Sequence, residues 1–180
     1  KLAFEMPAPV YSEAVINTVR LLKPVTGGDL VIRVPENTKS AKVRVIGASP
    51  VSLLTEALEA EVPAKDGVLL PDIENDVLRI ACVERYGKNG SIGKAFIRNF
   101  GLKEGALAIS VGHDHHNITV VGCDADDMAL AVNRVAELQG GFVLVNRGKV
   151  LEEIALPVCG LLSTESGDAV ADKLQKMLEL

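Results

Sequence analysis

The three histidines of this 180-residue chain lie within four positions, in the run GHDHHN at 112–117. Imidazole and carboxylate groups at this spacing could bind Zn²⁺, Mn²⁺ or Fe²⁺, with His113 and His115 as candidate ligands. A catalytic metal site needs three or four ligands, and the chain has no fourth histidine, so Asp or Glu would have to complete it. In the alternative interpretation, which the spacing favours, Asp114 and Asn117 cap a turn and the histidines make local hydrogen bonds or face solvent.

Two apolar runs flank this cluster, at 106–109 and 118–121, and each predicts a buried strand. The histidines therefore lie where one strand leads to the next, a place from which side chains can project into a cleft. In extended backbone, His113 and His115 would share one face while Asp114 and His116 share the other, whereas a tight turn would bring all four together.

Glu84 and Arg85 directly follow a predicted strand at 77–83. Such a pair forms an internal salt bridge or presents its charges to a ligand, and we expect the salt bridge. The glycine-rich run at 87–93 precedes a predicted helix, so its backbone N–H groups could cradle an anion. Because the run lacks the GK[ST] ending and the GxGxxG spacing of nucleotide sites, a flexible turn with Ser91 near the helix start fits better.

Hydrophobic periodicity and turn residues predict the remaining elements. The predicted strands cover residues 43–46, 67–71, 77–83, 106–109, 118–121, 142–145 and 149–154, with a hairpin turn at Asn146-Arg147-Gly148. The predicted helices cover residues 89–100, 125–138 and 168–178, while residues 53–60 fit either structure. Asp124 is a natural N-cap for the second helix, and the acidic run at 124–127 lacks the later glycine and glutamate of a calcium loop.

Strands and helices are mixed without a regular βαβ alternation. This predicts an α+β fold with one mainly antiparallel or mixed sheet, packed by three to four helices. Residues 1–40, with Pro7, Pro9, Pro24 and Pro35, read as a linker or lead-in with a short helix near 12–22 and a first strand at 30–34. Residues 41–180 form the predicted domain. Because the chain starts at Lys1 rather than methionine, we expect a piece of a longer protein.

Composition argues against two classes of partner. The net charge of −5, the pI near 5.3 and the lack of a Lys/Arg cluster argue against nucleic acid. No apolar run approaches the roughly 20 residues of a membrane span, and no leader is visible, so we expect no membrane partner and a soluble, cytoplasmic protein. Cys82, Cys123 and Cys159 are widely spaced, as expected for reduced core thiols.

An ordered series of segments resembles a known family. The segments are IACVERY at 80–86, NGSIGKAFIRNFGLKEGA at 89–106, HDHHNITVVG at 113–122, DDMALAVNR at 126–134, GGFV at 140–143 and LPVCGLLS at 156–163. Together they resemble the C-terminal domain of bacterial and archaeal adenine deaminase over most of residues 30–180. The family usually reads His-Asp-Ser-His-Asn at 113–117, so His115 is a departure, and it often has a histidine where this chain has Tyr86.

The resemblance implies an enzyme of the metal-dependent amidohydrolase superfamily, which converts adenine and water to hypoxanthine and ammonia in purine salvage. It also implies a homo-oligomer whose divalent metal, manganese, iron or zinc, is bound by a catalytic TIM-type barrel. Such a barrel needs about 250 residues and has no counterpart in this chain. We therefore expect an accessory fragment that is inactive alone and binds neither adenine nor metal by itself.

Within that family frame, the residues expected near the active site are His113, Asp114, His116 and Asn117, together with Glu84 and Arg85. They would reach the barrel mouth of the same or a neighbouring subunit and shield the substrate from water. Two alternatives stay open: a structural and oligomerisation module, and a stand-alone metal- or ligand-binding protein.

Overall fold

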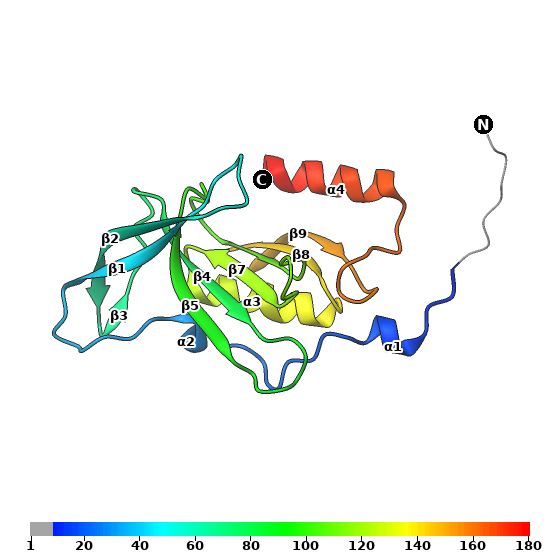
Figure 1. Ribbon diagram of the computed structural model, residues 1–180, viewed down its shortest axis with the longest axis horizontal. Helices are drawn as coiled ribbons and strands as arrows, with labels where there is room; N and C mark the ends of the chain where they lie inside the picture. The colour runs from blue at the N-terminus through cyan, green and yellow to red at the C-terminus, as the bar shows by residue number, and fades with distance from the viewer. Residues whose placement is uncertain (1–8) are drawn as a thin grey trace.

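The structure, a computed structural model, describes residues 9–180, and this part of the chain forms one open, mixed sheet of nine strands with helices on both faces (Figure 1). The strands are β1 Ser40–Gly47, β2 Glu56–Lys65, β3 Val68–Leu69, β4 Val77–Val83, β5 Ile92–Arg98, β6 Ala106–Ile109, β7 Ile118–Gly122, β8 Gly141–Asn146 and β9 Lys149–Ala155. The helices are α1 Glu13–Ile16, α2 Gly27–Leu30, α3 Ala125–Glu137 and α4 Gly167–Glu179.

The strand order is β3-β2-β1-β5-β4-β7-β6-β8-β9. Strands β1 and β5 run parallel, while the other neighbours are antiparallel. The predicted α+β class with one mainly antiparallel or mixed sheet is therefore confirmed. In the described part of the chain, no helix combines the length and apolar character needed to cross a bilayer.

Helix α3 covers one face of the sheet, over β6, β7 and β8. It begins at Asp124, whose carboxylate accepts the N–H groups of Asp126 at 2.9 Å and Asp127 at 3.0 Å. The N-cap predicted from the sequence is thus confirmed, and it satisfies two of the donors that a helix start leaves free. The buried stripe of α3 packs against inward-facing sheet residues in the main core, and its members are Met128, Ala129, Ala131, Val132 and Val135.

Helix α4 lies on the opposite face, where Met177 packs against Leu144 and Ile154. Consecutive residues of a strand point to opposite faces, so Glu152 and Glu153 of β9 reach different helices. Glu152 pairs with Lys176 of α4 at 2.5 Å, and Glu153 pairs with Arg134 of α3 at 2.7 Å. These hydrogen bonds to Lys176 and Arg134 lower the pKa of Glu152 and Glu153, respectively.

The segment that precedes β1 runs along α3. The side-chain amides of Asn133 and Gln139 each exchange two hydrogen bonds with its backbone, at Val25 and Val19 respectively. Val19, Val25 and Leu30 are buried in the same core as α3. Pro7 and the other residues at 1–8 of the predicted lead-in lie outside the described residues.

Three predicted elements, at residues 12–22, 30–34 and 67–71, differ from the structure. Residues 30–34 do not form a strand: one turn of helix, α2, precedes them, and only Arg33 makes an isolated bridge, to Val68. The Asp29 carboxylate accepts both the N–H and the hydroxyl of Thr26, and these contacts close the turn. The helix predicted near 12–22 is reduced to α1, and the strand predicted at 67–71 is reduced to β3.

The helix predicted over 89–100 is also wrong, because these residues contain strand β5. The strand pairs with β4 on one side and β1 on the other, deep in the sheet. Its consecutive residues Phe96 and Ile97 are both buried, one on each face. Burial on both faces hides the alternation that identifies a strand, and the spacing of Ile92 and Phe96 imitates a helical stripe.

Candidate functional site

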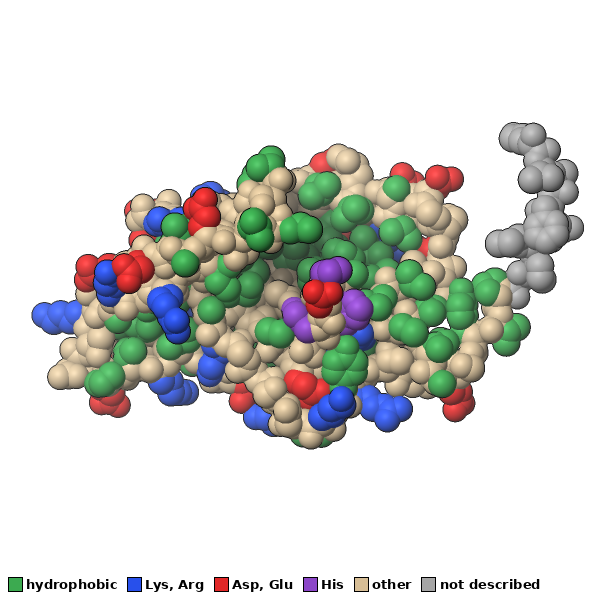
Figure 2. Space-filling view, viewed as in Figure 1, with side chains coloured by type: hydrophobic (Ala, Val, Ile, Leu, Met, Phe, Trp, Pro, Cys, Tyr) green, Lys and Arg blue, Asp and Glu red, His purple; other side chains and the backbone are tan. Residues whose placement is uncertain are grey.

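The histidine loop, defined as residues 112–117, is a tight turn between β6 and β7. The N–H of His116 donates to the carbonyl of Gly112 at 2.8 Å. Asp114 and His116 have positive φ angles of 69° and 49°, which residues other than glycine adopt in tight turns. Of the two geometries considered from the sequence, the structure therefore shows the turn. Figure 2 shows the three histidines together on one face, around an acidic side chain.

The side chains of the loop make local contacts. Nδ1 of His113 lies 3.1 Å from Oδ1 of Asp114, and these side chains are 91% and 87% exposed. Nδ1 of His115 accepts the N–H of Asn117 at 2.9 Å, so a neutral His115 carries its proton on Nε2. Within residues 9–180, no three His, Cys, Asp or Glu side chains converge as metal ligands. The donor set of the loop, with one imidazole nitrogen already engaged, does not fit a metal centre.

Arg85 holds the histidine loop in place from the protein interior. It is only 2% exposed, its Nε donates to the His116 carbonyl, and its Nη2 donates to the Cys159 carbonyl at 3.0 Å. The hydroxyl of Tyr86 donates to the His115 carbonyl at 2.9 Å. Two consecutive side chains thus hold the backbone of the loop and leave the side chains of His113 and Asp114 in solvent.

Arg85 and Glu84 do not bind each other, so the predicted salt bridge is wrong: no ion pair joins them in the described chain. The Glu84 carboxylate instead accepts N–H groups from the turn that follows it: Tyr86 at 2.5 Å, Lys88 at 3.1 Å, Asn89 at 3.3 Å and Gly90 at 3.1 Å. The glycine-rich segment does cradle an anion, but that anion is the chain's own carboxylate.

The pKa of Glu84 reflects this cradle. Desolvation is the largest single influence and favours the neutral acid, yet the backbone donors of Gly90, Tyr86, Asn89 and Lys88 together outweigh it and lower the pKa. Glu84 therefore remains a carboxylate that shapes the turn, and it is not available to an external ligand.

His115 lies at the edge of a hollow on the sheet face. Burial raises the pKa of the Cys82 thiol in this hollow. His115, Cys82 and Thr119 line this hollow together with apolar residues of β4 and β5. His115, the position at which the chain departs from the family pattern, is thus the histidine that borders the hollow.

The sequence patterns did not predict that residues 158–162 belong to the site. Cys159 has a φ of 58°, Gly160 a φ of 70°, and the Gly160 carbonyl accepts the buried Ser110 hydroxyl at 2.6 Å. A Cβ at Gly160 would overlap Nη1 of Arg85. The sequence carried one signal of this contact, the glycine in the Cys159-Gly160 pair, but periodicity alone does not assign such a glycine to a distant arginine.

The fold and the site together define an α+β domain that presents a fixed histidine loop beside an open sheet face. Residues 52–180 match the family model described as "Adenine deaminase C-terminal domain". The chain belongs to this family.

Named relatives agree with this assignment. The chain is 52% identical to "Adenine deaminase 1" of Carboxydothermus hydrogenoformans, over 92% of this chain and 27% of the relative. It is 47% identical to "Adenine deaminase" of Brucella melitensis, over 78% of this chain and 24% of the relative. It is 42% identical to "Adenine deaminase" of Mesorhizobium japonicum, over 99% of this chain and 30% of the relative. The match spans less than a third of each of these relatives.

Proposed function

We propose that this domain is the C-terminal part of an adenine deaminase, which hydrolyses adenine to hypoxanthine and ammonia, and that its histidine loop covers the active site of the catalytic domain. The names of the relatives support the reaction. The fixed loop supports the role of the domain: Arg85 and Tyr86 hold its backbone, while His113 and Asp114 stay exposed.

In this proposal the divalent metal belongs to the catalytic barrel, because the described residues of this chain do not fit it. The metal, which we take to be manganese, iron or zinc, would supply the hydroxide that attacks adenine. The histidine loop would exclude water and hold hydrogen-bond donors and acceptors over the bound purine. As part of the proposal, the enzyme is a cytoplasmic homo-oligomer that acts in purine salvage; these points rest on the family resemblance.

The loop is tested by His113→Ala and His116→Ala in the full-length deaminase. We expect each change to lower kcat/KM by at least about tenfold, because the loop acts in the closed complex. The melting temperature should change by no more than about 2 °C, because surface changes alter stability little. Steady-state kinetics and thermal melting measure both effects, and Lys65→Ala, at an exposed position on β2, is the matched control.

If the domain is instead a structural and oligomerisation module, the same two alanine variants should give the opposite result. If both alanine variants retain full turnover per folded site while assembly or melting changes, the loop has no role at the active site. The exposed apolar residues of this domain favour an interface.

A further inference from the structure

The face of the sheet opposite α3 is only partly covered. Helix α4 contacts β9 at one end of this face. Toward the other end, side chains of β1, β4, β5 and β7 point to the same side, because strand register places Ile80 beside Ala95 and Cys82 beside Thr119. The four named side chains are half-buried. On the same face, Leu78, Ile97 and Val121 are buried and pack with Ile73 and Leu102. We call this surface the open face.

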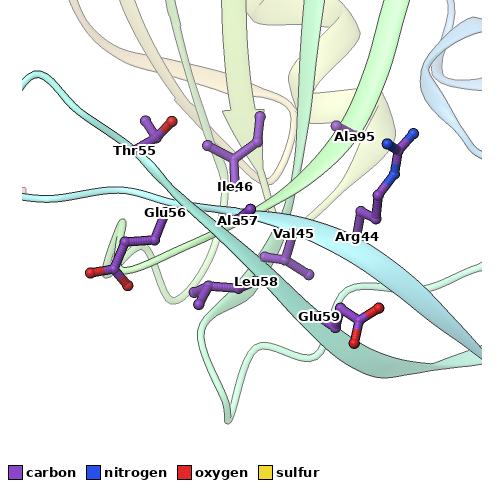
Figure 3. A pocket seen from close by; sticks show the side chains of 9 residues that line it. All are labelled: Arg44, Val45, Ile46, Thr55, Glu56, Ala57, Leu58, Glu59 and Ala95. Atoms are coloured by element: carbon purple, nitrogen blue, oxygen red, sulfur yellow. The ribbon is translucent and has the colours of Figure 1, made fainter.

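The open face is hollowed into a groove. One hollow is lined by residues of β1, β2 and β5, including Arg44, Glu56 and Ile46 (Figure 3). The hollow that reaches His115 shares Ile46 and Ala95 with it, so the two are continuous. The groove therefore runs from the β1–β2 hairpin to the histidine loop.

The segment between β1 and β2 leads into the groove at Thr55 and carries exposed apolar side chains. In the segment between β1 and β2, Val51, Leu53 and Leu54 are 93%, 103% and 81% exposed. Figure 2 shows apolar side chains gathered around the hollowed part of this face, with the histidines at its edge. A separate hollow at α4 is lined by Leu107, Phe142, Leu174 and Leu178, among others. Exposed apolar surface of this kind marks an interaction site.

We propose that the open face is the surface on which the catalytic part of the same deaminase polypeptide docks. The relatives indicate the occupant: the match covers 24 to 30% of their length, so most of each polypeptide lies outside this domain and is available to dock on it. The groove ends at His115, so a domain seated in it lies against the histidine loop. Charged residues at the far end, Arg44 and its cross-strand neighbour Glu59, supply the polar rim that such interfaces carry. This inference rests on the proposed function, because it identifies the partner of the same site.

The experiment is thiol labelling of two cysteine variants of the full-length deaminase. Leu53→Cys places a thiol two residues before Thr55 of the groove lining, and Leu22→Cys places one in the segment along α3, where Leu22 is 60% exposed. Each folded enzyme is labelled with a maleimide, and each site is quantified by peptide mass spectrometry relative to the denatured enzyme. We expect the thiol at 53 to react at least about tenfold more slowly in the folded enzyme and the thiol at 22 to change by less than about threefold.

Two results would overturn the inference. Equal labelling at both positions would mean that nothing covers the open face. Protection at 53 that is lost when the enzyme is diluted to monomers, as followed by mass photometry, would identify a second copy as the occupant. The labelling rate does not depend on activity, so the two proposals can fail separately. If the thiol at 53 is protected but the histidine-loop variants are fully active, only the role of the loop is refuted. If the thiol at 53 is not protected but the histidine-loop variants are impaired, only the docking surface is refuted.

Discussion

At the scale of single residues, the site depends on one buried cation. Arg85 joins the histidine loop to the turn at 158–162 through two backbone carbonyls, and its Nη1 has no hydrogen-bond partner in the described part of the chain. Nε and Nη2 bind backbone carbonyls and, among residues 9–180, no carboxylate pairs with the guanidinium, so Arg85 acts as a positioning residue. Lysine could not replace it, because a single ammonium lacks the planar fork that reaches both carbonyls.

Gly160 tests this packing, and Gly148 provides the matched control. Both have positive φ, at 70° and 73°, but a Cβ at Gly160 would overlap Arg85 while a Cβ at Gly148 meets open space. We expect Gly148→Ala to destabilise folding by about 1 kcal/mol through backbone strain alone. Gly160→Ala should destabilise it by about 3 kcal/mol or more, because the guanidinium must move. Urea denaturation measures both values.

Comparing Gly160→Ala with Gly148→Ala is informative because both substitutions introduce the same backbone strain. A difference in unfolding free energy between the two variants reports the contact with Arg85, and adding Arg85→Ala to each should reduce that difference. If Gly160→Ala and Gly148→Ala destabilise the domain equally, Arg85 does not occupy the position described here.

At the scale of elements, the turn that follows β4 is organised by Glu84. Its carboxylate accepts four backbone N–H groups from residues 86–90, and these contacts fix the direction in which Arg85 and Tyr86 leave the strand. The turn and the histidine loop therefore form one structural unit, since Tyr86 bonds the loop at His115.

This arrangement predicts a pH dependence of stability. The pKa of Glu84 is lowered in the folded state, so its stabilisation is complete above the ordinary carboxyl value of 4.5 and is lost as pH falls through the lowered pKa. Glu84→Gln should destabilise the domain by about 1 to 3 kcal/mol at pH 7, because an amide cannot accept all four N–H groups. The difference in unfolding free energy between wild type and variant should shrink as pH falls from 7 to 3.

Chemical denaturation at several pH values measures this difference, with Glu74→Gln at an exposed site as the control. A difference that grows or stays constant on acidification would show that the Glu84 carboxylate is not held by the cradle.

Elements defined by local pattern were predictable, and those defined by distant partners were not. Helix α3 has its own cap and stripe, and the β8–β9 hairpin has its own turn at Asn146-Arg147-Gly148, so both match the structure. Strand β5 pairs with the preceding strand β4 and also with the distant β1, and its burial on both faces left a local pattern that resembled a helix. The site followed the same rule: the turn at 112–117 was foreseen, whereas the Arg85–Cys159 contact between distant segments was not.

At the scale of the whole molecule, the two faces of the sheet differ. One face is closed by α3 and the preceding segment, and the other is closed only at one end by α4 (Figure 1). The histidine loop lies at the edge of the incompletely covered face, beside the groove. This asymmetry is what the proposed function requires, in which the domain completes the active site of a partner domain.

The central claim, that the histidine loop covers the active site, is tested most directly by hydrogen–deuterium exchange on the full-length deaminase, with and without hypoxanthine, the product of the proposed reaction. We predict that hypoxanthine slows exchange at least about threefold in peptides covering residues 111–118, while the turn between β2 and β3 at 65–68 stays unchanged. Unchanged exchange at 111–118, with hypoxanthine shown to be bound, would contradict the account.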